Sequence, residues 1–243
     1  MLKMICADLY KTFRRPFFYL LLAGMAVLAF AVNFSISRMG SEAITVTGSW
    51  VLVLGYFLSW PMLLMPILVD LVLAEEYKEH TLKNSVSFGL NRTGLYLSKT
   101  LSATVLGVLL GAVALGAYCG SAMLLLPWGP DFTGAFAGDF FRRVGISCIG
   151  YAAAIPMAAF LAMLLQKNSL FVFAYYGALA LPQLLLRIAR VPELAGRFLM
   201  MPQFGFIAGG TVQQMQVSTG IFLITAGVFL IAGISLFRKK DIC

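Results

Sequence analysis

The chain has 243 residues, of which 60% are hydrophobic and only 12% are charged, and its mean hydropathy is +0.90. Because a soluble domain usually has about 25% charged residues, a chain this apolar is expected to have lipid as part of its solvent. The net charge of +8 comes from cations scattered at the ends of apolar runs, a distribution that disfavours a nucleic-acid-binding surface.

The sequence is poor in residues that carry out chemistry. His80 is the only histidine, and none of the four cysteines lies in a C-x-x-C pair, so we expect no metal site. The P-loop, G-x-S-x-G and H-E-x-x-H patterns do not occur. Their absence argues against an enzyme and against a nucleotide or other cofactor bound by this chain.

Residues 1–16 combine apolar and basic side chains at roughly helical spacing. The pattern predicts an amphipathic helix on the inner leaflet, with its cations at the anionic lipid surface. The alternative is an ordinary basic flank that only sets the topology. The apolar members are Leu2, Ile5, Leu9 and Phe13, and the basic members are Lys3, Lys11 and Arg14.

Six apolar runs follow, each close to the ~20 residues that a helix needs to cross the hydrocarbon. Because these runs are continuous and do not alternate with polar residues, we expect helices and not strands. The first run resembles a signal peptide, but we interpret it as a retained anchor. The sequence therefore predicts an all-α polytopic membrane protein, a single transmembrane domain over residues 1–243, with spans at about 17–37, 50–73, 97–126, 143–165, 169–186 and 219–237.

The distribution of cations predicts the orientation of these spans. An even number of spans puts both termini on one side, and lysines and arginines are twice as numerous on that side. The positive-inside rule then places the termini and residues 74–96 in the cytosol.

Four prolines lie within the predicted spans: Pro61 and Pro66 in the second, Pro156 in the fourth and Pro182 in the fifth. Proline removes a backbone hydrogen bond and tends to kink a helix. These positions are hinge candidates for the opening of a pathway, and static kinks, which are common in membrane helices, are the alternative.

The third span contains two G-x-x-x-G patterns, formed by Gly107 with Gly111 and by Gly116 with Gly120. Small residues at this spacing let two helix backbones approach closely in a membrane. We expect tight helix packing here, and the partner helix could belong to the same chain or to a second copy.

Polar residues are rare inside the spans. Asp70 lies near the cytosolic end of the second span and could pair with a cation such as Lys99. Asn33, in the first span, is expected to form a hydrogen bond between helices.

Residues 187–218 separate the fifth and sixth spans and remain fairly apolar. Arg187 and Arg190 are three apart and Glu193 and Arg197 are four apart, as expected for a helix face at the headgroups. The sequence FGFIAGG follows. We predict a short outer helix and a partly re-entrant piece that caps the outer end of a pathway, with a membrane-hugging loop as the alternative.

The largest block of charged and polar residues spans 70–99, between the second and third spans. The helix of the second span is expected to continue through Glu75 and Glu76. Glu75 and Glu79 are four residues apart, as are Glu79 and Lys83, so one helix face is charged and the acid precedes the base. Gly89 then breaks the helix. This pattern predicts an elbow that projects into the cytosol, with a solvated charged loop as the alternative.

The block resembles the corresponding part of the permease subunits of type-2 ABC transporters. Those permeases tend to carry an acidic pair, then Gly-Thr-Leu, a short gap, Pro-x-Ser-Arg, and a lysine at the start of the next helix. Here the matching residues are Glu75-Glu76, Thr81-Leu82, Asn91-Arg92 and Lys99, while His80 replaces the usual glycine and Gly89 the usual proline. The six-span layout, the long outer segment and Gln-Lys-Asn-Ser at 166–169 are also similar.

The resemblance to these bacterial exporters implies a function. Two permeases would pair as a homodimer in the plasma membrane, and each would dock on a separate ATPase subunit that binds ATP and Mg. A cytosolic coupling helix would sit in a groove of that ATPase and pass its motion to the second and third spans. The implied interface residues are Glu75, Glu76, Tyr77, Lys78, Glu79, His80, Thr81, Leu82, Lys83 and Asn84.

The cargo class follows less directly. Compact permeases of this kind export hydrophobic or amphipathic peptides, drugs or lipids, and a pathway without fixed charges fits such cargo. The alternatives are a membrane-embedded sensory or structural partner and an ion-coupled carrier.

Overall fold

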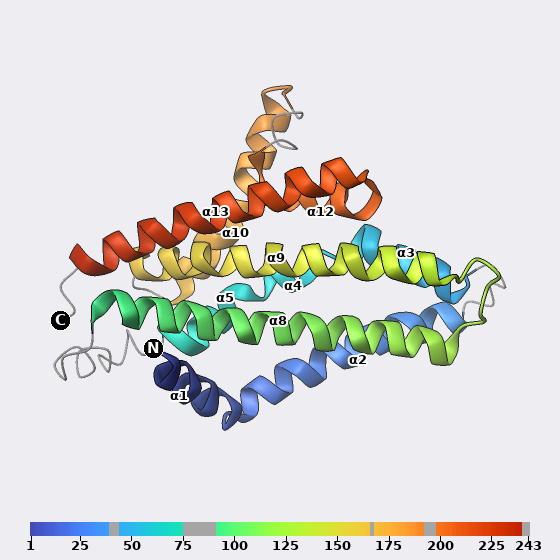
Figure 1. Ribbon diagram of the computed structural model, residues 1–243, viewed down its shortest axis with the longest axis horizontal. Helices are drawn as coiled ribbons and strands as arrows, with labels where there is room; N and C mark the ends of the chain where they lie inside the picture. The colour runs from blue at the N-terminus through green and yellow to red at the C-terminus, as the bar shows by residue number, and fades with distance from the viewer. Residues whose placement is uncertain (39–43, 75–90, 166–167, 192–197, 240–243) are drawn as a thin grey trace.

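The computed structural model describes residues 1–38, 44–74, 91–165, 168–191 and 198–239, and these residues form a bundle of helices (Figure 1). Six helical segments in the described part are long and apolar enough to cross a membrane, which confirms the predicted all-α polytopic fold. The helices are α1 (Leu2–Phe13), α2 (Pro16–Arg38), α3 (Val46–Leu52), η1 (Val53–Phe57), α4 (Trp60–Leu63), α5 (Met65–Val69), η2 (Asp70–Ala74), α8 (Arg92–Leu125), α9 (Gly134–Leu165), α10 (Asn168–Ile188), α12 (Met200–Gly209) and α13 (Val212–Lys239).

Several helices begin before the apolar run that predicted them. The third span was expected from residue 97 and the fourth from 143, whereas α8 begins at Arg92 and α9 at Gly134. Hydropathy reports only the part that matches hydrocarbon, and a helix can continue beyond it if its end is capped. At the start of α8, the side chain of Asn91 accepts a hydrogen bond from the backbone N–H of Thr93 at 3.1 Å.

The core of the bundle lies around α9, which packs along both α8 and α13, while α2 packs along α8 (Figure 1). Small residues make this possible. A Cβ added at Gly150 of α9 would lie 2.8 Å from the ring of Phe222 and 2.9 Å from that of Phe204. The aromatic side chains of α12 and α13 therefore pack directly on the backbone of α9.

The long helices define two ends of the bundle. The terminal end holds α1, the start of α8 and the end of α13, and the opposite end holds the start of α9 and the end of α12 (Figure 1). Helix α10 crosses the other helices steeply, and its second half projects past α13 (Figure 1). Its apolar side chains Leu185 and Ile188 are 62% and 71% exposed, so the described residues give this part of α10 little cover.

Candidate functional site

The second span is the least regular helix of the bundle. Between Val46 and Ala74 it passes through α3, η1, α4, α5 and η2, of which η1 and η2 have π-helical hydrogen bonding. Pro61 and Pro66, two of the predicted hinge candidates, lie at the starts of α4 and α5. A proline has no N–H to donate, so an unbroken α-helix cannot form across these positions.

The interruption leaves three backbone carbonyls without their normal helical donors. The carbonyl of Met62 would be paired with residue 66, which is a proline. The N–H groups of Met62 and Ile67 bond three residues back, to Ser59 and Leu64, at 3.2 and 3.1 Å. These tighter turns free the carbonyls of the residues one position earlier, 58 and 63.

Three tyrosine hydroxyls from neighbouring spans donate to these carbonyls. Tyr151 of α9 donates to Leu58 at 2.5 Å. From α10, Tyr175 donates to Met62 and Tyr176 to Leu63, each at 2.8 Å. Tyr151 and Tyr175 are fully buried. We call these three residues the tyrosine clamp.

The tyrosine clamp explains how an interrupted helix is stable here. In a bilayer no water can satisfy a free carbonyl, and each unsatisfied group costs several kcal/mol. The clamp supplies the missing donors and so fixes the second span against α9 and α10. The prolines are recognisable in the sequence, whereas the three tyrosines were not predicted as site residues. The available signal was that each interior proline frees a carbonyl that needs a donor from a nearby helix.

Tyr151 also contacts the helix at the opposite end of the bundle. Its ring stacks on that of Phe204 in α12, with centroids 5.7 Å apart and planes at 16°. Phe204 in turn packs on Phe222 of α13 at 5.3 Å. One side chain thus joins the interruption of the second span, through its hydroxyl, to α12, through its ring.

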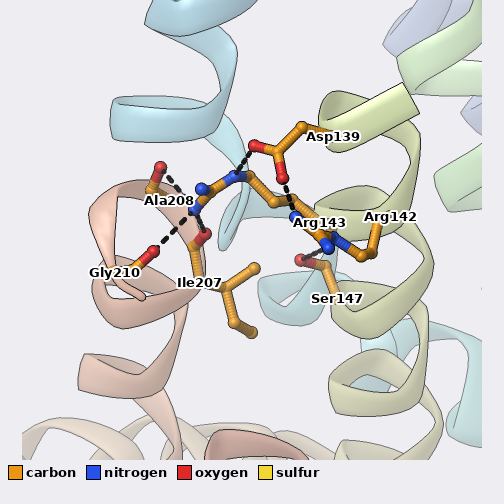
Figure 2. A network of polar contacts seen from close by, with 7 residues as sticks. All are labelled: Asp139, Arg142, Arg143, Ser147, Ile207, Ala208 and Gly210. Carbon is orange, nitrogen blue, oxygen red and sulfur yellow. Dashed lines mark hydrogen bonds and ion pairs between the residues drawn. The ribbon is translucent and has the colours of Figure 1, made fainter. Parts of the chain in front are cut away.

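The C-terminal end of α12 is held by Arg143 of α9 (Figure 2). The guanidinium Nη1 donates to the carbonyls of Ile207, Ala208 and Gly210 at 2.5, 3.1 and 3.3 Å. Its Nε donates to Asp139 at 2.6 Å. A helix C-terminus carries unpaired carbonyls and a partial negative charge, so a cation there both satisfies and stabilises it.

A hydrogen bond to α13 fixes α12 at a second point. The hydroxyl of Ser218 in α13 donates to the side-chain oxygen of Gln203 at 2.9 Å, and both residues are buried. Helix α12 covers the FGFIAGG sequence, for which a re-entrant piece was predicted. Glu193 and Arg197 of the predicted outer helix lie outside the described residues.

A buried ion pair joins α1 to α8 at the terminal end. The Nζ of Lys99 lies 2.5 Å from Oδ1 of Asp8, and the two residues are only 5% and 9% exposed. The hydroxyl of Ser102 donates to the other carboxylate oxygen at 3.4 Å. Sequence analysis named Asp70 as a partner for Lys99 and did not find Asp8. Asp70 begins η2, which packs against both α1 and α8.

A polar cluster joins α2, α3 and α8 between the tyrosine clamp and the opposite end of the bundle. The amide nitrogen of Asn33 donates to the carbonyl of Tyr118 and to the hydroxyl of Ser121, both at 2.8 Å. The amide oxygen accepts from Ser49 at 2.7 Å. The hydrogen bond between helices that was predicted for Asn33 is confirmed, and its full use of both amide atoms indicates a structural role.

The glycines of the third span occupy two different environments. A Cβ at Gly107 would lie 2.9 Å from Ile155 and from Met65, so this position packs against α9 and the second span of the same chain. A Cβ at Gly111 would lie 3.2 Å from the ring of Tyr151. Gly116 and Gly120 have open space beside them, with nothing within 4 Å.

The remaining predicted site residues can be placed as follows. Pro156 and Pro182 lie inside α9 and α10, which continue through them as α-helices. The predicted coupling residues 75–84 lie outside the described residues. Among the described residues, no three His, Cys, Asp or Glu side chains gather where they could hold a metal ion.

Two apolar cavities adjoin these features. One, of about 70 Å³, lies between α2, the second span and α8 and is lined in part by Phe57, Pro61 and Tyr118. The other, of about 300 Å³, lies among α9, α10, α12 and α13, and three of its lining residues are methionines. Apart from single tyrosine and threonine hydroxyls, the side chains around both cavities are apolar.

The six apolar spans, with the hydrogen bonds and the ion pair that join them, define a multi-pass membrane protein. A family model described as "ABC-2 family transporter protein" matches residues 4–177, and the chain belongs to this family. It is therefore a permease, a membrane component of an ABC transporter that works with a separate ABC ATPase. The matched region includes the Asp8–Lys99 pair and the whole tyrosine clamp, whereas α12 and α13 follow it. No curated protein matches the chain.

Proposed function

We propose that this chain is the permease subunit of an ATP-driven exporter and that its ATPase partner pushes on residues 75–84. The observation that carries the proposal is the position of the tyrosine clamp on the second span, which the structure describes as far as Ala74, the residue before this block. This span leads from the clamped carbonyls through α5 and η2 to Ala74. Movement of 75–84 would therefore reach the clamp through η2 and α5, and α8, which follows the block, is anchored by Lys99.

The cavities support a hydrophobic or amphipathic cargo, such as a peptide, a drug or a lipid. The larger cavity is lined by the flexible side chains of Met157, Met200 and Met201, together with Phe198 and Phe229. Methionine adapts its shape to varied apolar partners and is common at surfaces that bind them. Two of these methionines belong to α12, which we infer to cap the outer end of the pathway.

The exposed helices support a homodimer. The second half of α10 projects past α13 (Figure 1), and its apolar side chains Leu185 and Ile188 are left exposed by the described residues. The open sides of Gly116 and Gly120 would also allow another helix to approach. A second copy that packs against α10 would bury this apolar surface.

The two ends of the bundle support cytosolic termini in the plasma membrane. Exposed lysines are found at the terminal end, at Lys3, Lys11 and Lys239, whereas Arg38 and Arg142 are exposed at the other end. The excess of cations at the terminal end agrees with the positive-inside rule. In this orientation residues 75–84 face the ATPase.

Reconstitution with the ATPase subunit in liposomes tests the proposal. Charge reversal at Glu75, Glu76 and Glu79 is expected to abolish copurification and cargo-stimulated ATP hydrolysis while leaving membrane insertion intact. Reversal at three acids elsewhere, Glu42, Asp131 and Glu193, changes the net charge equally and serves as the matched control.

The outcomes separate the candidate functions. If the first triple variant copurified and transported as well as the control, the assignment of residues 75–84 would be wrong. Transport without ATP would indicate the ion-coupled carrier, and an ATPase partner that cargo never stimulates would indicate a sensory or structural subunit.

A further inference from the structure

Helix α1 presents two unlike faces. The inward face packs on α8 and η2 through its half-buried apolar residues and contains Asp8, the only acid of the helix. Because Asp8 is buried and paired with Lys99, its charge is neutralised inside the protein. The inward residues are Met4, Ile5, Asp8, Leu9 and Thr12.

The exposed face is divided again into two strips. At 3.6 residues per turn, one strip is formed by apolar residues and a free thiol, and the adjacent strip by cations. The side chain of Leu2 is 79% exposed and that of Tyr10 59% exposed. The apolar strip consists of Leu2, Cys6, Tyr10 and Phe13, and the cationic strip of Lys3, Lys11 and Arg14.

This division has the geometry of a helix at a membrane surface. A solvated helix has no reason to expose Leu2 and Phe13 along one line, whereas a helix in the headgroup layer buries such a strip in the acyl boundary. The adjacent cations then lie at the level of lipid phosphates. The guanidinium of Arg14 lies 4.6 Å from the centre of the Tyr10 ring, which holds the cation at the border between the strips.

Cations of α8 and α13 lie at the same end of the bundle as α1. Arg238 and Lys239, in the last turn of α13, are exposed, and Arg92 at the start of α8 donates to the carbonyl of Arg238 at 3.3 Å. Together with the cationic strip of α1, they come from three helices that share one end of the bundle (Figure 1). Their charge is complementary to a layer of anionic headgroups.

We propose that α1 binds anionic lipid headgroups at the terminal end and that this binding holds the base of α8 in place through the Asp8–Lys99 pair. The lipid binding stands independently of the transport function. If α8 must be held in place for coupling, coupled transport requires anionic lipid, and this consequence rests on the proposed exporter function.

Cys6 offers a local probe of the lipid beside α1, because it lies in the apolar strip and is exposed. In full-length protein whose other cysteines are serine, a fluorophore on Cys6 can be quenched by spin-labelled lipid in nanodiscs of phosphatidylcholine and phosphatidylglycerol. Quenching by spin-labelled phosphatidylglycerol is expected to exceed quenching by spin-labelled phosphatidylcholine. Each cation removed from the strip should lower that preference by up to about fivefold.

The variant Lys3→Gln/Arg14→Gln removes two cations from the strip. Its matched control, Arg38→Gln/Arg187→Gln, removes two exposed arginines elsewhere and includes a similar cation–ring contact, between Arg38 and Phe34 at 5.1 Å. Only the first variant should lose the preference at Cys6. Equal quenching by both lipids in the unmodified strip, or an equal loss in both variants, would overturn the proposal.

The remaining readouts separate lipid from protein and binding from regulation. If the ATPase subunit shielded Cys6 in discs of phosphatidylcholine alone, α1 would face the protein partner and the lipid assignment would be overturned. Coupled transport that is equal with and without phosphatidylglycerol would overturn the requirement for anionic lipid. An absence of transport in every lipid, with the preference at Cys6 retained, would refute the exporter function and support the lipid site.

Discussion

Replacing Tyr151 with phenylalanine removes the hydroxyl that donates to Leu58 and keeps the ring that stacks on Phe204. An entirely unsatisfied carbonyl would cost several kcal/mol, but measured hydrogen bonds between membrane helices contribute on average about 0.6 kcal/mol, and at most about 1.7, because the alternative arrangement also finds partners. Because folded domains are stable by about 5–15 kcal/mol, the variant is expected to fold. The same energy alters an equilibrium between two arrangements of the second span by roughly threefold to twentyfold. We therefore expect an uncoupled protein, in which ATP hydrolysis continues and transport falls.

The assay must distinguish the hydroxyl from the ring. Spin labels at Tyr56 in η1, which is 71% exposed, and at Phe206 in α12 report the distance between the two elements that Tyr151 joins. Tyr151→Phe should broaden this distance distribution as much as Tyr151→Leu, which also removes the ring. Tyr175→Phe deletes the equivalent hydroxyl over Met62 and should broaden it less. If Tyr151→Phe behaved like wild type and only Tyr151→Leu had an effect, the hydroxyl would not be the link.

Three further substitutions test the supports around the clamp. Arg143→Gln should lower the free energy of unfolding by about 2–3 kcal/mol, because three carbonyls at the end of α12, those of Ile207, Ala208 and Gly210, lose a charged donor. Arg142→Gln at the exposed neighbouring position should change it by less than about 0.5 kcal/mol, and chemical unfolding in detergent measures both. Lys99→Met should cost about 3–5 kcal/mol by leaving Asp8 buried without its cation, and the double variant with Asp8→Leu should recover most of this loss, as thermal unfolding would show. Gly150→Ala should cost about 1–3 kcal/mol, because two aromatic rings must move, and a melting temperature equal to wild type would contradict the close packing.

The fold could be predicted because lipid imposes a simple requirement. A helix that crosses hydrocarbon must be apolar along its whole length, so each span leaves a continuous record in the sequence. All six predicted spans are confirmed. The helix ends were less accurate, since a cap such as Asn91 is a local hydrogen bond that a hydropathy window does not register.

The site was less accessible to prediction because its parts are far apart in the sequence. Pro61 and Pro66 were recognisable as interruptions. The tyrosines that donate to the freed carbonyls, however, are 93 to 113 positions away from those carbonyls in the sequence. Asp8 is 91 residues from Lys99, and in the sequence it reads as part of a basic segment. Spacing rules describe neighbours on one helix, whereas these contacts depend on which helices pack together.

The clamp also clarifies how an interrupted span could transmit a push. A continuous helix behaves as a rod, but a helix broken near Pro61 and Pro66 would bend at the break and dissipate the movement. Under the proposed function, hydrogen bonds from α9 and α10 to the carbonyls at the break would transfer displacement to these helices before the span could bend freely. Since only Tyr151 of the three also stacks on α12, displacement of the second span would reach α12 through α9 as well as through the direct packing of η1 on α12. In such an arrangement the position of the break would determine where the second span bends, and the positions of the hydroxyl donors would determine which neighbouring helix moves with it.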